Sequence, residues 1–294
     1  MAQRMSNWLR RYDAMSYTAA RAVIGEYSTS FNLASRLLPA QERRDIRNLY
    51  AVVRIADEIV DGTARAAGAR DVGQLLDDYE RQVLAAPGQP FHTDPVLHAY
   101  AHTARRCGFS AEHITAFFAS MRRDLGHAGY SRAELDDYVY GSAEVIGLLC
   151  LDVFLADSEM PSARRADLEV GAQRLGAAFQ KVNFLRDLGE DTEDLGRSYF
   201  SHLELTGELD EEAKDTLVTE IRGDLAAARD TVGLLPIRVR AAVLAATNLF
   251  TELTDMIEQT PAARLPLQRL SVPAHRKAVL TIQAAAQATG GKAR

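Results

Sequence analysis

The placement of proline is the feature that most constrains how this 294-residue chain can fold. Each of the nine prolines lies near a break between segments and not inside a long periodic one, where it would remove a backbone hydrogen bond and clash with the preceding turn. The intervening segments are rich in Ala, Leu, Arg, Glu and Gln, their apolar residues recur at the helical period, and they show no sustained strand alternation. The sequence therefore predicts an all-α fold, with helices near residues 10–25, 42–61, 71–86, 94–107, 110–126, 131–157, 163–192, 209–233, 236–258 and 272–288.

Composition narrows the class of protein further. Hydrophobic residues make up 47% of the chain and charged residues 25%, the balance of a globular domain large enough to enclose a cavity. The net charge of −6 argues against a nucleic-acid partner, because such proteins carry a basic excess. Two cysteines cannot build a disulfide framework. Because the sequence shows no repeat and no linker, we expect one domain over residues 1–294. The low cysteine content favours a location in the cytoplasm. The sequence leaves the oligomeric state open.

The sequence predicts no membrane span. Its longest apolar stretch, Val145 to Ala156, has about 12 residues, whereas a bilayer needs about 20, and the first residues lack the apolar run of a secretory signal. Trp8-Leu9-Arg10-Arg11-Tyr12 is expected to form a packed helix, and peripheral contact with a membrane surface is the alternative for this segment.

Two stripes of polar residues carry the candidate chemistry. At about 100° per residue on a helix, Tyr50, Arg54, Asp57 and Asp61 fall within about 60° of one another. A second narrow stripe follows later in the chain and is flanked by apolar residues. It consists of Gln180, Asn183, Asp187 and Asp191.

Each stripe places two carboxylates four residues apart, where they repel each other, and burying them without partners costs free energy. Divalent cations offset both costs. Mg²⁺ prefers oxygen ligands and completes its shell with water and phosphate, so two facing stripes could hold a metal-bridged diphosphate, with Arg54 neutralising phosphate charge. Solvated helix faces are the alternative interpretation. A di-iron bundle is excluded, because no Glu is followed three residues later by His.

In combination, these motifs resemble those of the squalene/phytoene synthase family of head-to-head isoprenyl diphosphate synthases. Their residues are most like those of a bacterial phytoene synthase. The similarity runs from about residue 25 to 200. The matching segments are Tyr27-Ser28-Thr29-Ser30-Phe31, residues 50–61, Met121 to Leu125 with Asp124, residues 138–147, residues 180–191 and Arg197-Ser198-Tyr199-Phe200.

The resemblance implies an isoprenoid synthase fold, with helices around a central substrate cavity. It implies Mg²⁺, which Mn²⁺ could replace, on Asp57, Asp61, Asn183, Asp187 and Asp191. The same aspartates would act in catalysis together with Arg54 and Tyr199. Substrate contacts are implied for Ser28, Ser30, Phe31, Tyr50, Tyr138, Gly147, Gln180, Asn183, Arg186 and Arg197.

The reaction implied is condensation of two geranylgeranyl diphosphates to phytoene through a cyclopropyl diphosphate, without NADPH. The alternatives are farnesyl diphosphate condensation to a C30 product and a non-catalytic helical protein that binds a prenyl lipid. Chain-elongating prenyltransferases fit less well, because they carry Asp-Asp-x-x-Asp where this chain has Asp57-Glu58-Ile59-Val60-Asp61.

Three further features call for a structural test. Glu144 replaces a glycine of the family pattern and is expected to narrow or polarise the cavity wall. Tyr140, like Tyr138, is a candidate to steer a cation or pass a proton. His98 and His102 have the spacing of a metal-binding pair, but no third ligand is evident and a surface or capping role is favoured.

Overall fold

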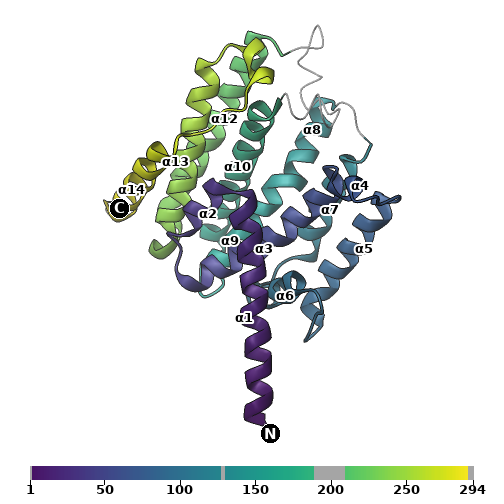
Figure 1. The fold of residues 1–294 in the computed structure, drawn as a ribbon. Coiled ribbons are helices and arrows are strands. Elements are labelled where there is room, and N and C mark those ends of the chain that lie inside the picture. The colour runs from purple at the N-terminus through teal and green to yellow at the C-terminus, as the bar shows by residue number, and fades with distance from the viewer. Residues whose placement is uncertain (1, 127–129, 189–208, 291–294) are drawn as a thin grey trace.

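The computed structural model describes residues 2–126, 130–188 and 209–290, which form helices and contain no β-strand (Figure 1). The predicted all-α fold is confirmed. The α-helices are α1 (Ala2–Tyr27), α2 (Thr29–Ser35), α3 (Ala40–Val60), α4 (Thr63–Ala66), α5 (Val72–Ala85), α6 (Pro95–Cys107), α7 (Ala111–Arg123), α8 (Arg132–Val139), α9 (Val145–Leu155), α10 (Ser162–Arg186), α12 (Glu211–Thr231), α13 (Ile237–Gln259) and α14 (Ala274–Gly290).

The boundaries differ from prediction at two places that matter for function. Residues 28–35, which carry the Ser-x-Ser-Phe motif, form the separate helix α2, whose first turn is capped by the Ser28 side chain. The helix predicted over residues 163–192 ends at Arg186, and Asp187 is its C-cap. The helical-wheel argument for the second stripe therefore stops at Asp187. The small helix α4 also lies inside residues 62–70, which were expected to form a loop.

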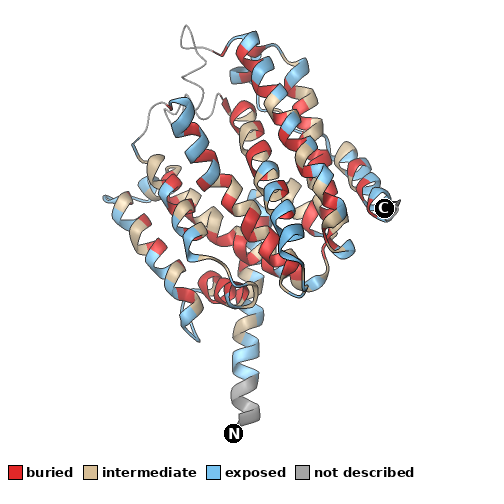
Figure 2. Ribbon diagram, turned by 180° about the vertical axis from the view of Figure 1, so that it is seen from behind, coloured by how far each residue is buried: buried red, intermediate tan, exposed pale blue. Residues whose placement is uncertain are grey.

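The helices pack as a bundle around α10. This helix contacts α12 on one side and, on the other, α9 and the π-helical turn Tyr140–Glu144, while α1 packs on α3 and α6 and α13 packs on α14. Figure 2 shows buried residues along the central helices. The N-terminal end of α1 extends beyond the rest of the bundle (Figure 1).

The helical run of residues 132–155 is long and apolar enough, by length and composition alone, to cross a membrane. It behaves as a core helix. Half of its apolar window is buried, and Asp152 pairs with Arg165 of α10 at 2.6 Å. Residues at a four-residue spacing line the central cavity, among them Tyr138, Ser142 and Ile146. Part of its apolar surface is therefore turned toward the cavity inside the bundle.

Glycines bring this helix into backbone contact with its neighbours. A Cβ added to Gly176 of α10 would lie 2.8 Å from the carbonyl carbon of Ala143 and closer still to the carbonyl oxygen. One added to Gly147 would lie 3.0 Å from the carbonyl carbon of Ala172. Gly147 lines the cavity as predicted for a substrate contact, and its close approach to α10 is a second reason for a glycine there. These approaches set the spacing of the two helices that form one cavity wall.

Gly176→Ala is expected to lower the free energy of unfolding by about 1–3 kcal/mol, because backbone atoms of Ala143 cannot yield to the new methyl group. Gly223→Ala is the matched control. Gly223 lies on the exposed face of α12 with nothing within 4 Å of the added Cβ, so this substitution should stabilise by about 0.5–1 kcal/mol. Urea unfolding measures both. If both substitutions changed the free energy of unfolding by the same amount and in the same direction, the close contact between α10 and the π turn would not be what makes Gly176 necessary.

Candidate active site

A cavity of about 760 Å³ lies inside the bundle, with walls from α2, α3, the 132–155 helix, α10 and α13. All predicted site residues that the structure describes line this cavity. They are Ser28, Ser30, Phe31, Tyr50, Arg54, Asp57, Asp61, Tyr138, Gly147, Gln180, Asn183, Arg186 and Asp187. Asp191, Arg197 and Tyr199 lie outside the described residues. The two polar stripes, more than 120 residues apart in the sequence, thus meet at one cavity.

Carboxylates crowd one part of the cavity wall. Asp57 and Asp61 come from α3 and its C-cap, and Asp124 is the C-cap of α7. Burial raises the pKa of Asp57 well above its usual range, and the neighbouring charges of Asp61 and Asp124 raise it further. The ionised form of Asp57 is therefore disfavoured unless a cation joins it.

The helix ends add to this imbalance. Asp61 is the C-cap of α3 and Asp187 is the C-cap of α10, and each backbone N–H donates to the carbonyl four residues earlier at 2.8 Å. A helix C-terminus carries partial negative charge, so a carboxylate is unfavourable there and a cation is favourable. Two aspartates at two such ends form an electrostatic arrangement that a divalent cation would stabilise.

Arg54 is held beside these carboxylates. It pairs with Glu58, lies 3.8 Å from Asp57 and places its guanidinium carbon 4.4 Å from the ring centre of Tyr27. Its Nε atom is buried and makes no hydrogen bond to the described residues. Arg54 can therefore offer a donor to an anionic ligand in the cavity.

Basic side chains gather around Asp187. Arg186 contacts this carboxylate at 2.5 Å and the Nε atom of Arg269 contacts it at 3.0 Å. Lys277 of α14 lines the same cavity and donates to the Thr29 hydroxyl at 2.9 Å. Burial, followed by the charge of Arg186, lowers the pKa of Lys277. These basic side chains lie close together and repel one another, so a bound anion such as diphosphate would be favourable here.

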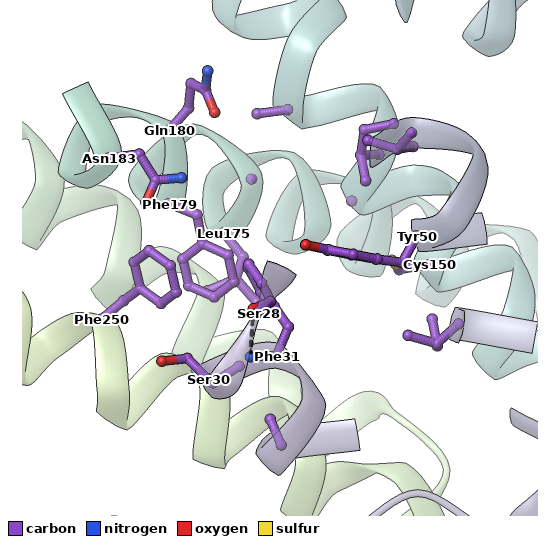
Figure 3. A pocket seen from close by; sticks show the side chains of 18 of the residues that line it. Ser28, Ser30, Phe31, Tyr50, Cys150, Leu175, Phe179, Gln180, Asn183 and Phe250 are labelled. Atoms are coloured by element: carbon purple, nitrogen blue, oxygen red, sulfur yellow. Dashed lines mark hydrogen bonds between the residues drawn. The ribbon is translucent and has the colours of Figure 1, made fainter. Parts of the chain in front are cut away.

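Aromatic and apolar side chains make up much of the remaining wall, with polar residues such as Ser30 and Gln180 among them (Figure 3). Phe179 of α10 stacks on Phe250 of α13 with ring centres 3.7 Å apart, and Phe31 of α2 lies 5.7 Å from Phe179. Tyr50 faces the same space, and burial raises its pKa to about 12, so its hydroxyl stays neutral near pH 7. Such a lining excludes water and presents ring faces to a carbocation.

Tyr138 and Ser28 have local partners. The hydroxyl of Tyr138 donates to Asp124 at 2.9 Å, so it is tied to the acidic side of the cavity. The Ser28 hydroxyl accepts from the backbone N–H of Phe31 at 3.2 Å (Figure 3). Ser28 thus fixes the start of α2 and, with it, the position of Phe31.

Several residues differ from the sequence-based expectations. Glu144 does not line the cavity, and its carboxylate accepts from Gln173 at 3.2 Å, so the expected narrowing or polarising of the wall is wrong. Tyr140 is 40% exposed and outside the cavity lining. Lys277 was missed and Asp124 was given no role. Asp124 ends a recognisable motif, whereas nothing in the sequence near Lys277 indicates its proximity to residues 29 and 186.

The His98–His102 pair gains a neighbour that the sequence did not indicate. Asp13 of α1 lies 2.8 Å from Nε2 of His98 and 3.8 Å from Nε2 of His102. Nδ1 of His98 accepts from the backbone N–H of His92 at 3.3 Å, which leaves the proton on Nε2 for Asp13. That tautomer joins α1 to α6 through hydrogen bonds and has no Nε2 lone pair for a metal.

The donor set of the cavity fits Mg²⁺. Asp57 and Asp61 of one stripe and Asn183 and Asp187 of the other offer oxygen atoms, and the raised pKa of Asp57 marks an excess of negative charge that a divalent ion removes. Bound there, Mg²⁺ would neutralise phosphate charge and make diphosphate a better leaving group.

Asp57→Asn should separate stability from metal binding. In the presence of diphosphate, Mg²⁺ at about 100 times its Kd should raise the free energy of unfolding of the wild-type protein by about 2.7 kcal/mol. The amide has no charge to desolvate, so the metal-free variant should be at least as stable as wild type and should lose most of the Mg²⁺ response. Asp78→Asn, on the exposed face of α5, is the control. Thermal unfolding with EDTA or Mg²⁺ measures both, and a full Mg²⁺ response in Asp57→Asn would contradict the assignment.

Comparison with known proteins agrees with this geometry. The family model described as squalene/phytoene synthase matches residues 24–276. A phytoene synthase of Arthrospira platensis is 29% identical over 266 residues, which cover 83% of this chain and 84% of that protein. A 4,4'-diapophytoene synthase of Staphylococcus haemolyticus is 32% identical over 195 residues, covering 65% of this chain and 64% of that protein. A crystal structure of a dehydrosqualene synthase in complex with ligand superposes with a TM-score of 0.79, covering 96% and 99% of the two chains at 22% identity.

Proposed function

The chain belongs to the squalene/phytoene synthase family and is a prenyltransferase of head-to-head condensation, and from this premise we propose that it joins two geranylgeranyl diphosphates to form phytoene in carotenoid biosynthesis. The proposed intermediate is a cyclopropyl diphosphate. The second half of the proposed reaction is a rearrangement with loss of a proton, which consumes no NADPH.

The polarity gradient along the cavity is the observation that carries this proposal. On α3 the lining residues run from Ile46 and Leu49 to Asp57 and Asp61, and on α10 they run from Ala172 through Phe179 to Asp187. The two ends of each stretch are fifteen positions apart, or about 22 Å along the helix. One end suits a metal-bound diphosphate and the other a long hydrocarbon, which is the division of polarity in a prenyl diphosphate.

Small side chains support the longer substrate. The apolar part of the cavity is lined by Ala172 of α10 and by Ala242 and Ala246 of α13, whose small side chains suit a C20 chain. Similarity to a phytoene synthase over most of both chains supports the same choice. Condensation of two farnesyl diphosphates to a C30 product is the second candidate, because the chain is also 32% identical to a 4,4'-diapophytoene synthase over a shorter region.

The residues of the cavity have distinct tasks in the proposed reaction. Arg54, Arg186 and Lys277 hold the departing diphosphate and keep it from recombining with the allylic cation. The ring faces of Tyr50 and Phe179 stabilise the cation while the double bond of the second molecule attacks. The apolar walls exclude water, which would otherwise capture the cation as an alcohol.

Product analysis tests the proposal. Pure protein with Mg²⁺ and no NADPH is incubated separately with geranylgeranyl and farnesyl diphosphate, and diphosphate release and extracted hydrocarbon are followed. A C40 hydrocarbon with a central triene is expected from geranylgeranyl diphosphate. Its formation should fall at least 10³-fold in Asp57→Ala and in Asp187→Ala, since each removes charge that the leaving group requires.

Other products would replace the proposal. A C30 product as the preferred outcome, or a cyclopropyl diphosphate that goes further only with NADPH, would assign the chain to C30 synthesis. Binding of both substrates without diphosphate release would favour the non-catalytic lipid-binding alternative.

We also propose a cytoplasmic enzyme that contacts a membrane surface through the N-terminal end of α1. Tyr12 packs against Phe91 with ring centres 4.9 Å apart and donates to the carbonyl of His92 at 2.8 Å, as expected for a packed helix. Trp8 and Leu9 are 71% and 49% exposed where α1 extends beyond the bundle (Figure 1). An exposed Trp beside basic residues suits a lipid surface, which would also receive a hydrocarbon product.

Trp8→Ser is expected to weaken binding to vesicles of phosphatidylcholine and phosphatidylglycerol more than tenfold, because burial of a large apolar side chain contributes about 2 kcal/mol. Ile282→Ser removes an equally exposed apolar side chain from α14 and serves as the control. Vesicle flotation measures both. If the two variants bound the vesicles equally well, contact with the membrane through α1 would be contradicted.

A further inference from the structure

A second cavity, of about 230 Å³, lies between α1 and the first two turns of α3. Tyr17, Thr18 and Arg21 of α1 line it together with residues from the start of α3. The α3 residues are Ala40, Arg43, Arg44 and Arg47. It shares no lining residue with the catalytic cavity, which α3 borders through other residues, among them Ile46, Leu49 and Tyr50.

This cavity concentrates positive charge in a chain whose net charge is −6. Among the residues that the structure describes, none of Arg21, Arg43, Arg44 and Arg47 forms an ion pair with a carboxylate. The arginines elsewhere in the described helices are mostly paired, as Arg106, Arg122 and Arg165 illustrate. No carboxylate of the described residues therefore neutralises these four guanidinium groups.

The acidic residues of the same stretch cannot supply it. Glu42 is buried and pairs with Arg238 of α13 at 2.7 Å. Asp45 is buried, pairs with Arg106 of α6 at 2.7 Å and also accepts from Thr103 and Gln41. Both carboxylates already have partners on other helices, so the arginines of α3 have no counter-charge on their own element.

Arg47 is half-buried, and one of its nitrogen atoms is shielded from solvent. Its Nε atom is removed from solvent and makes no hydrogen bond to the described residues, and its nearest acceptor, the Asn32 amide oxygen, is 3.5 Å from a terminal nitrogen. Burial lowers the pKa of Arg47, and the charges of Arg43, Arg21 and Arg36 lower it further. A shielded N–H donor without an acceptor costs free energy, and a ligand that accepts from Arg47 would remove this cost.

The surrounding geometry favours an anion as that ligand. Arg43 and Arg44 lie in the first turns of α3, where the helix itself carries partial positive charge, and the N-cap, Pro39, makes no side-chain cap hydrogen bond. Arg44 is held with its guanidinium carbon 4.6 Å from the ring centre of Tyr17. Several planar forks fixed around one small cavity match the bidentate geometry of phosphate oxygens.

We propose that the cavity between α1 and α3 is a binding site for a phosphate group, with Arg43 and Arg47 as its main contacts and Arg21 and Arg44 completing the charge. Its volume is below the range of about 300–1,000 Å³ that holds whole organic ligands, so it suits a phosphate or diphosphate group. The group could belong to free diphosphate, which the proposed reaction releases, or to the headgroup of an acidic phospholipid.

Binding to the full-length protein tests the proposal. Inorganic diphosphate is titrated by calorimetry in EDTA, which keeps Mg²⁺ out of the catalytic cavity, and vesicles with and without phosphatidylglycerol are tested by flotation. The double variant Arg43→Gln/Arg47→Gln should weaken one of these interactions at least tenfold. Arg81→Gln/Arg222→Gln, which removes the same charge from arginines of α5 and α12 that have carboxylate partners, should bind as wild type does.

Two further measurements exclude a merely structural effect. Without ligand, Arg43→Gln/Arg47→Gln should be at least as stable as wild type, because it relieves repulsion among arginines. It should also keep its rate of diphosphate release from prenyl diphosphate within about twofold, since neither residue lines the catalytic cavity. The conservative Arg43→Lys/Arg47→Lys variant keeps the charge but loses the bidentate geometry, so it should recover part of the affinity.

The two arms identify the source of the phosphate group. Loss of diphosphate binding with unchanged flotation assigns the site to a free phosphate compound. Loss of flotation on phosphatidylglycerol vesicles alone assigns it to a lipid headgroup, and comparison with Trp8→Ser then separates the headgroup contact from apolar insertion of α1. If diphosphate binding and vesicle flotation are each the same for the variant, its control and the wild-type protein, the proposal is wrong.

Discussion

The placement of carboxylates at the C-terminal ends of two helices is the constraint on which the site depends. Asp61 closes α3 and Asp187 closes α10, and both carboxylates lie where the helix ends are already negative. Asp57 adds a third carboxylate, disfavoured as an anion by burial and by Asp61. In an ordinary core such a cluster would be a defect. In this cavity the cluster would bind a divalent cation together with diphosphate. Arg186 and Arg269 hold Asp187 in place.

The charge cluster works only because backbone packing fixes the helices that carry it. Gly176 and Gly147 let α10 approach the π turn and α9 at backbone distance, and side chains larger than hydrogen do not fit there. The residues of this contact also border the cavity, whose wall continues with Phe179 and its stacking partner Phe250. A carbocation reaction requires this combination, because polar groups must be confined to one end and water excluded from the other.

Helical periodicity was enough to predict most helices and to place Asp57, Asn183 and Asp187 on one cavity, because residues at a spacing of three to four share a face wherever the helix runs. It could not predict that α10 ends at Arg186, since local sequence does not encode the C-cap that tertiary contacts impose. The same limit applies to Lys277, which reaches Thr29 from almost the opposite end of the chain. Glu144 was misjudged because it lies in the π turn, where side chains point in other directions than in an α-helix.

Helix α3 separates two opposite imbalances of charge. Its C-terminal end carries the cavity residues Asp57 and Asp61, and its N-terminal end carries Arg43, Arg44 and Arg47, which form no ion pair with a carboxylate of the described residues. Helix polarity opposes both placements, since acids stand at its negative end and bases at its positive end. The two imbalances do not relieve each other, because Asp61 and Arg47 are fourteen residues, or about 21 Å, apart along the axis. Each end therefore suits a ligand of its own, a divalent cation among the aspartates and, in the proposed site, a phosphate group among the arginines.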